Sequence, residues 1–210
     1  MLTVALHLLA FAAGVVAWTL AEYGLHRGAM HALRGKGIMS REHLEHHVRA
    51  SWSFDVNHIL SWIGMLLVGF GLLAPAAAAL TSWSMGFTLA VGWAAGYVTY
   101  EYQHARAHLR APRWRYHRWV ARHHFHHHFG HPNANHGVSV PWWDHVFGTY
   151  ERPEIVRVPR RLVIGWLVDD DGAVRREWAD DYELVGRNHR DEATARDDRD
   201  RAFASVAPQS

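Results

Sequence analysis

One uncharged tract of 45 residues, from Val56 to Tyr100, limits the folds available to this 210-residue chain more than any other feature. A membrane-spanning helix needs about 20 predominantly apolar residues, so the tract can hold two crossings and a short turn between Pro75 and Ser84. Met1 to Leu20 form another uncharged stretch, long enough for one crossing. The sequence therefore predicts an all-α integral membrane protein with about three transmembrane crossings. A buried helical hairpin for the tract and a cleaved signal peptide for the first stretch are the alternatives, although no basic residue precedes that stretch.

Basic residues are concentrated between the first and second predicted crossings and after the third. They are Arg27, Arg34, Lys36, Arg41 and Arg49 in the first segment, and Arg106, Arg110, Arg113, Arg115, Arg118 and Arg122 in the second. Loops rich in Lys and Arg stay on the cytoplasmic side of a membrane. We therefore expect both segments on the cytoplasmic face of an inner or plasma membrane, with the amino terminus outside.

Four histidine clusters occupy these same two segments, two in each. Ten of the 19 histidines belong to them: His26 and His31; His43, His46 and His47; His104 and His108; His124, His127 and His128. Neutral imidazole is the commonest protein ligand for transition metals, and ten imidazoles exceed what one ion can use. The clusters therefore predict a cytoplasmic, histidine-rich helical cap that holds two metal ions.

The spacing within three of the clusters suits a helix. Histidines at positions i, i+3 and i+4 share one helix face, as the two H-x-x-H-H clusters require, and His104 and His108 are four residues apart. His26 and His31 are five residues apart, which is a rotation of about 140° on an α-helix. We therefore expect a helix end or a local break near Gly28. Glu22 and Glu101 precede two of the clusters, where they could accept a hydrogen bond from a ligand histidine or be ordinary helix-end residues.

The composition excludes several classes of protein. The chain has no cysteine, so it forms no disulfide and binds no iron–sulfur cluster or zinc through thiolates. The net charge of +2 and the absence of a basic surface interleaved with aromatic residues argue against nucleic acid as a partner. We expect residues 1–150 to form the membrane-embedded domain, 151–186 a cytoplasmic extension with a turn at Asp169–Gly172, and 187–210 a disordered tail of charged and small residues.

The order of the motifs resembles that of the fatty acid hydroxylase and sterol desaturase superfamily. H-x4-H, H-x2-H-H, an apolar hairpin, H-x3-H and H-x2-H-H follow one another, and then come Asn-His-Gly-Val at 135–138 and Trp-Asp-His-Val-Phe-Gly-Thr at 143–149. The last two resemble the NFGV and WDxxFGT ending of that superfamily. The resemblance extends from about Glu22 to Thr149.

This resemblance implies a membrane oxidase that hydroxylates or desaturates a fatty acyl chain, sterol, carotenoid or related lipid. The implied cofactor is a pair of iron ions held by the ten clustered histidines, with O2 as co-substrate and electrons from a separate reductase. Zinc also accepts imidazole ligands and could replace iron in preparations. His136 stands where the superfamily usually has an aromatic residue, so it is either an extra ligand or a packing replacement. His123, His126 and His127 also fit H-x2-H-H, but counting back from Gly137 favours the frame of His124, which leaves His123 and His126 behind the ligands or at the surface.

Two other classes of function are compatible with the sequence. A membrane zinc hydrolase would use three protein ligands for a single ion, but the chain contains no H-E-x-x-H motif. A metal-binding or transport protein without chemistry should carry ionisable residues within its crossings, where only His7 and His58 are found.

Overall fold

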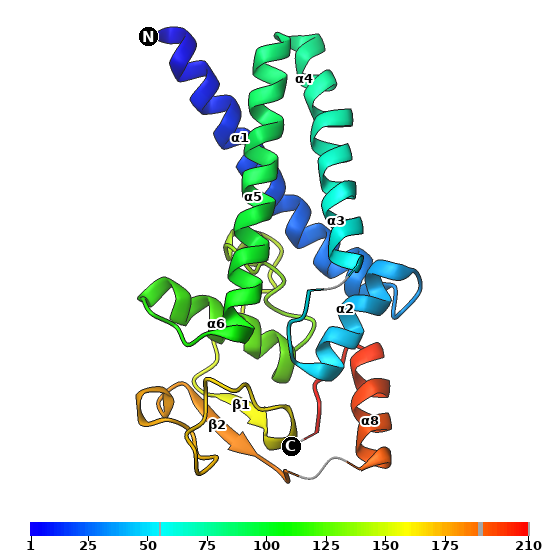
Figure 1. Cartoon of the computed structure of the whole chain (residues 1–210), viewed down its shortest axis with the longest axis vertical. Helices are drawn as coiled ribbons and strands as arrows, with labels where there is room; N and C mark the ends of the chain where they lie inside the picture. The colour runs from blue at the N-terminus through cyan, green and yellow to red at the C-terminus, as the bar shows by residue number, and fades with distance from the viewer. Residues whose placement is uncertain (55, 189–190, 210) are drawn as a thin grey trace. The chain divides into compact units, whose positions relative to one another are not determined.

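The computed structural model describes residues 1–54, 56–188 and 191–209, and these are mostly helical (Figure 1). They form two compact units. The first consists of Met1–Glu22 and Ser53–Tyr102, and the second of Tyr23–Trp52 and Gln103–Ser210. All four histidine clusters belong to the second unit, together with the segment after Thr149.

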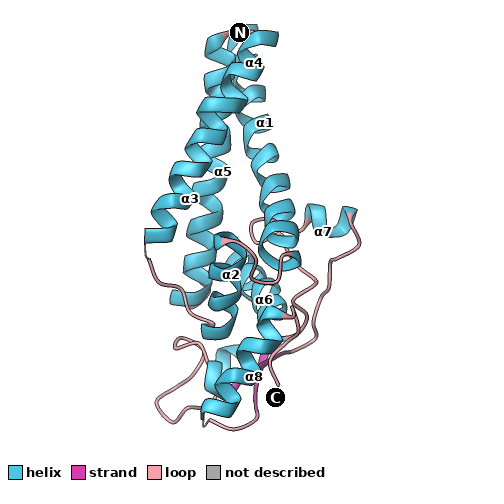
Figure 2. Cartoon of the chain, turned by 90° about the vertical axis from the view of Figure 1, so that its right-hand side faces the viewer, coloured by secondary structure: helices cyan, strands magenta, loops and turns pink. Residues whose placement is uncertain are grey.

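The first unit contains the predicted membrane-spanning segments. Its elements are α1 (Leu2–Gly24), α3 (Val56–Leu66), the π-helix η2 (Leu67–Leu73), α4 (Ala74–Leu80) and α5 (Trp83–Leu109), of which α1 and α5 continue into the second unit. The ribbon from α3 to α4 runs antiparallel to α5, with the turn at residues 81–82 (Figures 1 and 2). The expected turn between Pro75 and Ser84 is therefore present, and Pro75 lies in the first turn of α4.

Two helices among the described residues are long and apolar enough to cross a membrane, Leu2–Ala32 and Val56–Leu80. Only 17% and 11% of the most apolar 18-residue stretches of these two helices are buried. The core helix of a soluble protein would be mostly buried. Exposed apolar helices of this length associate with a membrane. α5, the third expected crossing, is not one of the two, so that crossing stays a prediction.

Glycines bring α1 and α5 into backbone contact within the first unit. A Cβ atom on Gly14 would lie 2.0 Å from the carbonyl oxygen of Leu89, and one on Gly92 would lie 2.1 Å from that of Phe11. Small residues of this kind allow close packing of membrane helices. The ring of Trp18 packs edge-on against Trp93, with ring centroids 5.3 Å apart. His7 Nε2 lies 3.1 Å from Ser84 Oγ, which joins the two helices by a hydrogen bond.

The second unit builds the histidine segments onto short helices and a small sheet. Its elements are the π-helix η1 (Leu25–Ala32), α2 (Ile38–Arg49), α6 (Arg115–Phe129), α7 (Trp142–Val146), β1 (Val156–Pro159), η3 (Arg160–Leu162), η4 (Arg176–Trp178), β2 (Tyr182–Val185) and α8 (Glu192–Phe203). Strands β1 and β2 are parallel, with Val156 opposite Tyr182. The predicted turn after Val168 is present: Gly172 donates its N–H to the carbonyl of Asp169 at 3.1 Å.

The end of the chain differs from the expected disordered tail, because residues 192–203 form α8. Asp191 caps this helix by accepting a hydrogen bond from the Thr194 N–H at 2.8 Å. Asp198 is buried and accepts two hydrogen bonds from Arg161, at 3.0 and 2.6 Å. The charged composition suggested disorder because the partner arginine lies 37 residues earlier in the chain. Residues 189, 190 and 210 of the expected tail lie outside the described part.

Candidate metal centre

A change of helix type places the first histidine pair on one face. His26 and His31 lie in η1, a π-helical segment that continues α1 without interruption. A π-helix forms i→i+5 hydrogen bonds, so residues five apart come back to nearly the same face. The spacing that does not suit an α-helix is therefore accommodated by a wider helix. The centroids of the two buried rings are 5.2 Å apart.

The ten clustered histidines form two groups of five. The first histidine group contains His26, His31, His43, His47 and His127, and the second contains His46, His104, His108, His124 and His128. Within each group, one nitrogen from every ring lies within 4.8 Å of the others. His123 and His126 lie outside both groups, as does His136.

Each H-x-x-H-H cluster is divided between the two groups. Residues i and i+4 of an α-helix are about 40° apart in rotation, whereas residue i+3 lies about 60° to the other side of residue i. His43 and His47 accordingly join the first group, while His46 joins the second. In α6 the pair His124 and His128 joins the second group and His127 the first. Each cluster therefore contributes histidines to both groups, although its three members share one helix face.

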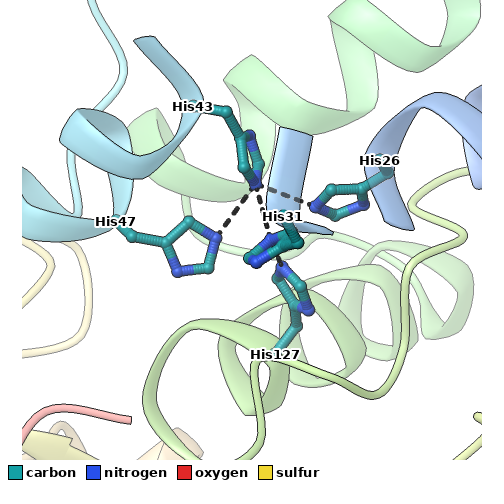
Figure 3. Close-up of side chains that lie close together, drawn as sticks. All are labelled: His26, His31, His43, His47 and His127. Carbon is teal, nitrogen blue, oxygen red and sulfur yellow. Dashed lines mark hydrogen bonds between the residues drawn. The ribbon is translucent and has the colours of Figure 1, made fainter. Parts of the chain in front are cut away.

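Short distances between Nε2 atoms define the centre of each group. In the first group, His43 Nε2 lies 3.0 Å from that of His26, 2.9 Å from that of His31 and 3.1 Å from that of His47 (Figure 3). The Nε2 atoms of His31 and His127 are 3.0 Å apart. In the second group, Nε2 of His104 lies 3.0 Å from that of His46, and Nε2 of His108 lies 2.9 Å from that of His124.

Backbone carbonyls determine which ring nitrogen carries the proton in four of these histidines. Nδ1 lies 2.6 Å from the His136 oxygen in His26 and 2.7 Å from the Ala134 oxygen in His127. The corresponding partners are the Ser51 oxygen for His46, at 2.8 Å, and the Ala50 oxygen for His108, at 3.1 Å. A carbonyl only accepts hydrogen bonds, so Nδ1 must donate. In a neutral ring, Nε2 then has a lone pair and no proton.

Closely spaced, unprotonated Nε2 atoms are suited to bind a cation. His26 and His127 both direct such lone pairs into the first group, and their ring centroids are 4.4 Å apart. In the second group, both ring nitrogens of His128 are buried and have no hydrogen-bond partner among the described residues. Lone pairs facing one another repel, and buried polar atoms without partners are costly. A transition metal ion in each group would satisfy these nitrogens at once.

Burial also keeps the imidazoles in the form that binds metal. Removal from water is the main reason that the pKa values of His43, His47, His124, His127 and His128 lie well below 6.5, and neighbouring histidines lower them further. The neutral ring is the metal ligand, so no proton has to leave before an ion binds at neutral pH.

Asp144 organises the loop that holds His26. Its carboxylate is fully buried and accepts hydrogen bonds from the backbone N–H groups of His136 and Gly137, both at 2.8 Å, and from the Thr149 hydroxyl at 2.7 Å. The carbonyl of His136 is thereby directed to Nδ1 of His26. The imidazole of His136 lies beside the first group, 5.3 Å from the His26 ring between centroids, and its Nε2 lies 3.2 Å from the Asn133 carbonyl.

The remaining candidates from the sequence have other contacts. His123 Nε2 lies 3.5 Å from an Asp144 oxygen, and His126 Nε2 lies 2.8 Å from an oxygen of Glu151. Glu101 accepts a hydrogen bond from the Tyr97 hydroxyl at 2.9 Å, and Glu22 is buried. Both glutamates belong to the first unit, and their role as partners of the histidines stays a prediction.

Sequence reasoning missed the partners on the far side of the ligand rings. Backbone carbonyls carry no side-chain signal, so those of Ala50, Ser51, Ala134 and His136 could not be found from residue types. Ser205, whose hydroxyl lies 3.2 Å from Nδ1 of His31, is 174 residues away in the chain and falls in the segment expected to be disordered.

A family model and two curated relatives agree on one protein family. The family described as fatty acid hydroxylase matches residues 11–149. The fatty acid 2-hydroxylase of Macaca fascicularis is 27% identical over 158 residues, which cover 69% of this chain and 41% of the relative. The dihydroceramide fatty acyl 2-hydroxylase FAH2 of Arabidopsis thaliana is 29% identical over 145 residues, covering 65% of this chain and 58% of the relative. The chain thus spans about half the length of these curated relatives.

A solved structure described as full-length scs7p, with only its hydroxylase domain visible, is similar in fold. The TM-score is 0.51 and the sequence identity 26%, over 70% of this chain and 57% of the other.

Proposed function

Because the chain belongs to the fatty acid hydroxylase family, we propose that it is a membrane-bound oxidoreductase that uses O2 to hydroxylate a lipid. The observation that carries this proposal is the pair of five-histidine groups, in each of which one nitrogen from every ring lies within 4.8 Å of the others. Two curated relatives are named for hydroxylation at position 2 of a fatty acid or of a dihydroceramide acyl chain. We therefore favour a fatty acyl chain over a sterol or carotenoid as the substrate.

We propose that each histidine group holds one iron ion, five imidazoles to each. Imidazole suits iron, copper and zinc alike, so zinc could occupy the same ligands in a purified sample. When bound, a pair of iron ions supplies the O2 reduction that hydroxylation of an unactivated C–H bond requires and that no side chain performs alone.

The residues of the chain prepare the centre for that chemistry. Burial keeps the ligand rings neutral, and the carbonyls of Ala50, Ser51, Ala134 and His136 fix four of them with Nε2 facing inward. The apolar helices Leu2–Ala32 and Val56–Leu80 would place the protein in a membrane, where an acyl chain is soluble. We further propose three crossings, with the histidine segments on the cytoplasmic side, and a separate electron-transfer protein, because reduction of O2 consumes electrons that the histidines do not supply.

The test is to supply the purified protein with fatty acyl lipids, ¹⁸O2 and a reductase system, and to analyse the products by mass spectrometry. We expect a hydroxylated lipid that contains the label, and no product from the His104→Ala variant or without O2. A desaturated product would carry no label but would still require O2, so oxygen dependence is the broader criterion. Equal product formation in the absence of O2 would refute the proposal and favour a zinc hydrolase.

A further inference from the structure

The carboxyl-terminal segment after residue 190 contacts the first histidine group. The Ser205 hydroxyl oxygen lies 3.2 Å from Nδ1 of His31, and both side chains are buried. This segment lies beyond residues 11–149, the part of the chain that matches the family. The contact therefore belongs to a part of this protein to which the family comparison assigns no role.

His31 differs from four of the other clustered histidines in the kind of partner that its Nδ1 atom has. The Nδ1 atoms of His26, His46, His108 and His127 all lie against backbone carbonyls, which no substitution removes. The partner of His31 is a side-chain hydroxyl. When that hydroxyl accepts a hydrogen bond from the Nδ1–H group of His31, Nε2 is left unprotonated and faces His43 and His127, at 2.9 and 3.0 Å.

Several contacts hold Ser205 at this place. Its N–H donates to the Ala202 carbonyl at 2.9 Å, and its own carbonyl accepts a hydrogen bond from the Asn133 side chain at 3.0 Å. Its backbone is left-handed, with φ of +55°, as at the end of a helix. A Cβ atom on Gly35 would lie 2.5 Å from the Phe203 ring, so the two are in tight contact.

Two ion pairs connect α8, the helix before Ser205, to other parts of the second unit. Asp198 in α8 binds Arg161 through two hydrogen bonds, and both side chains are almost completely buried. Arg199 pairs with Glu45, which directly precedes His46 in α2. The position of Ser205 is therefore determined by the folded structure around it and not by the flexibility of a chain end.

We propose that the segment from Asp191 to Ser205 is an integral part of the metal centre, with Ser205 as a positioning residue for His31. By accepting the Nδ1–H hydrogen bond, the hydroxyl selects the tautomer of His31 and orients its Nε2 toward the ion of the first group. This inference rests on the proposed function, because it assumes that the first group binds a metal ion.

The experiment measures metal affinity in the full-length chain, purified in detergent and titrated with Zn²⁺ against chelators of graded strength. Loss of a hydrogen-bond partner behind a metal ligand lowers affinity by about 10- to 100-fold. We expect Ser205→Ala to weaken one of two Zn²⁺ ions by about tenfold and to leave the other unchanged. Ser205→Gly should behave in the same way, since it also lacks the hydroxyl group and glycine adopts the left-handed backbone without strain.

Thr194→Ala is the matched control, because it removes a hydroxyl group from the first turn of α8, and it should bind both ions as the wild type does. Wild-type affinity for both ions in Ser205→Ala and Ser205→Gly would overturn the inference and leave the proposed function intact. Equal weakening of both ions, accompanied by a lower melting temperature of the metal-free variants, would also overturn it, because it would indicate a general role in folding. A wild-type chain that binds no metal would instead contradict the proposed function itself.

Discussion

At the scale of single residues, the site depends on imidazoles that are kept neutral and correctly oriented. A free histidine titrates near pH 6.5, and either of its nitrogens can carry the proton. Here burial disfavours the charged form, and the carbonyls behind the rings select the tautomer that exposes Nε2. The residue type makes metal binding possible, but the surroundings of each ring make it a ligand.

Removal of one ligand should therefore affect one group more than the other. His127 is the sole contribution of α6 to the first group, and its Nε2 lies 3.0 Å from that of His31. We expect His127→Ala to lower the bound metal from about two ions per chain toward one and to abolish hydroxylation. Elemental analysis of the purified protein measures the first effect. His131→Ala, in a half-exposed residue paired with Glu151, should retain wild-type metal content, and an equal loss in this control would contradict the assignment.

The lowered pKa values also predict how the metal-free protein responds to acid. Burial lowers the pKa of His136 to about 3, and those of His43, His47, His124, His127 and His128 lie well below 6.5. Below pH 6.5 the unfolded chain takes up protons that the folded chain does not, so stability decreases as the pH falls. Between its unfolded and its folded pKa value, each such histidine lowers the free energy of unfolding by about 1.4 kcal/mol for every unit by which the pH falls.

The measurement is the melting temperature of metal-free protein between pH 7.5 and 5.5. We expect a steep decrease below about pH 6.5, and a smaller one after Zn²⁺ is added, because bound metal competes with protons for the same nitrogens. A melting temperature that stays constant over this range would show that the rings are not buried in neutral form.

Among the elements, the helical faces that carry the histidines were predictable from the sequence, whereas the π-helix η1 and the helix α8 were not. The i+4 spacing of His104 and His108 needs only an ordinary α-helix, and α5 provides it. The π-helix at His26 and His31 was not predictable, because i+5 spacing is equally compatible with a helix end. The division of each H-x-x-H-H cluster follows from helix geometry, but only once two binding points are known. α8 was missed because the residue that stabilises it, Arg161, is distant in sequence.

The buried ion pair between Asp198 and Arg161 allows the contribution of α8 to stability to be measured separately. Asp198→Ala would leave the Arg161 guanidinium buried without its carboxylate, and breaking a buried pair in this way costs about 3–5 kcal/mol. We expect a lower free energy of unfolding by roughly that amount, measured by denaturant titration in detergent. Asp200→Ala, an exposed residue of the same helix, should change it by less than about 0.5 kcal/mol. A neutral Asp198→Ala variant would mean that α8 is not held by this pair.

At the scale of the whole molecule, the composition of the two histidine groups restricts the number of crossings. Each group combines histidines from the segment before the uncharged tract with histidines from the segment after it, as His26 with His127 and His46 with His104. If the apolar helices span a membrane, both segments must therefore lie on one side of it. A chain that crosses with Val56–Leu80 must cross again before His104. α5 is the segment available for that return, although it is less apolar than the other two helices.

Placement of both histidine segments on the same side of the membrane predicts the topology that reporter fusions would detect. A reporter inserted near Gly35 or fused to the carboxyl terminus should lie in the cytoplasm, because both adjoin segments rich in arginine, and one inserted near Ala78 should lie outside. Reporters at Gly35 and at the carboxyl terminus on opposite sides would separate His26 from His127, and neither five-histidine group could form. Both on the outside would preserve the groups and refute only the orientation. The comparison thus tests the shared site and its cytoplasmic placement separately.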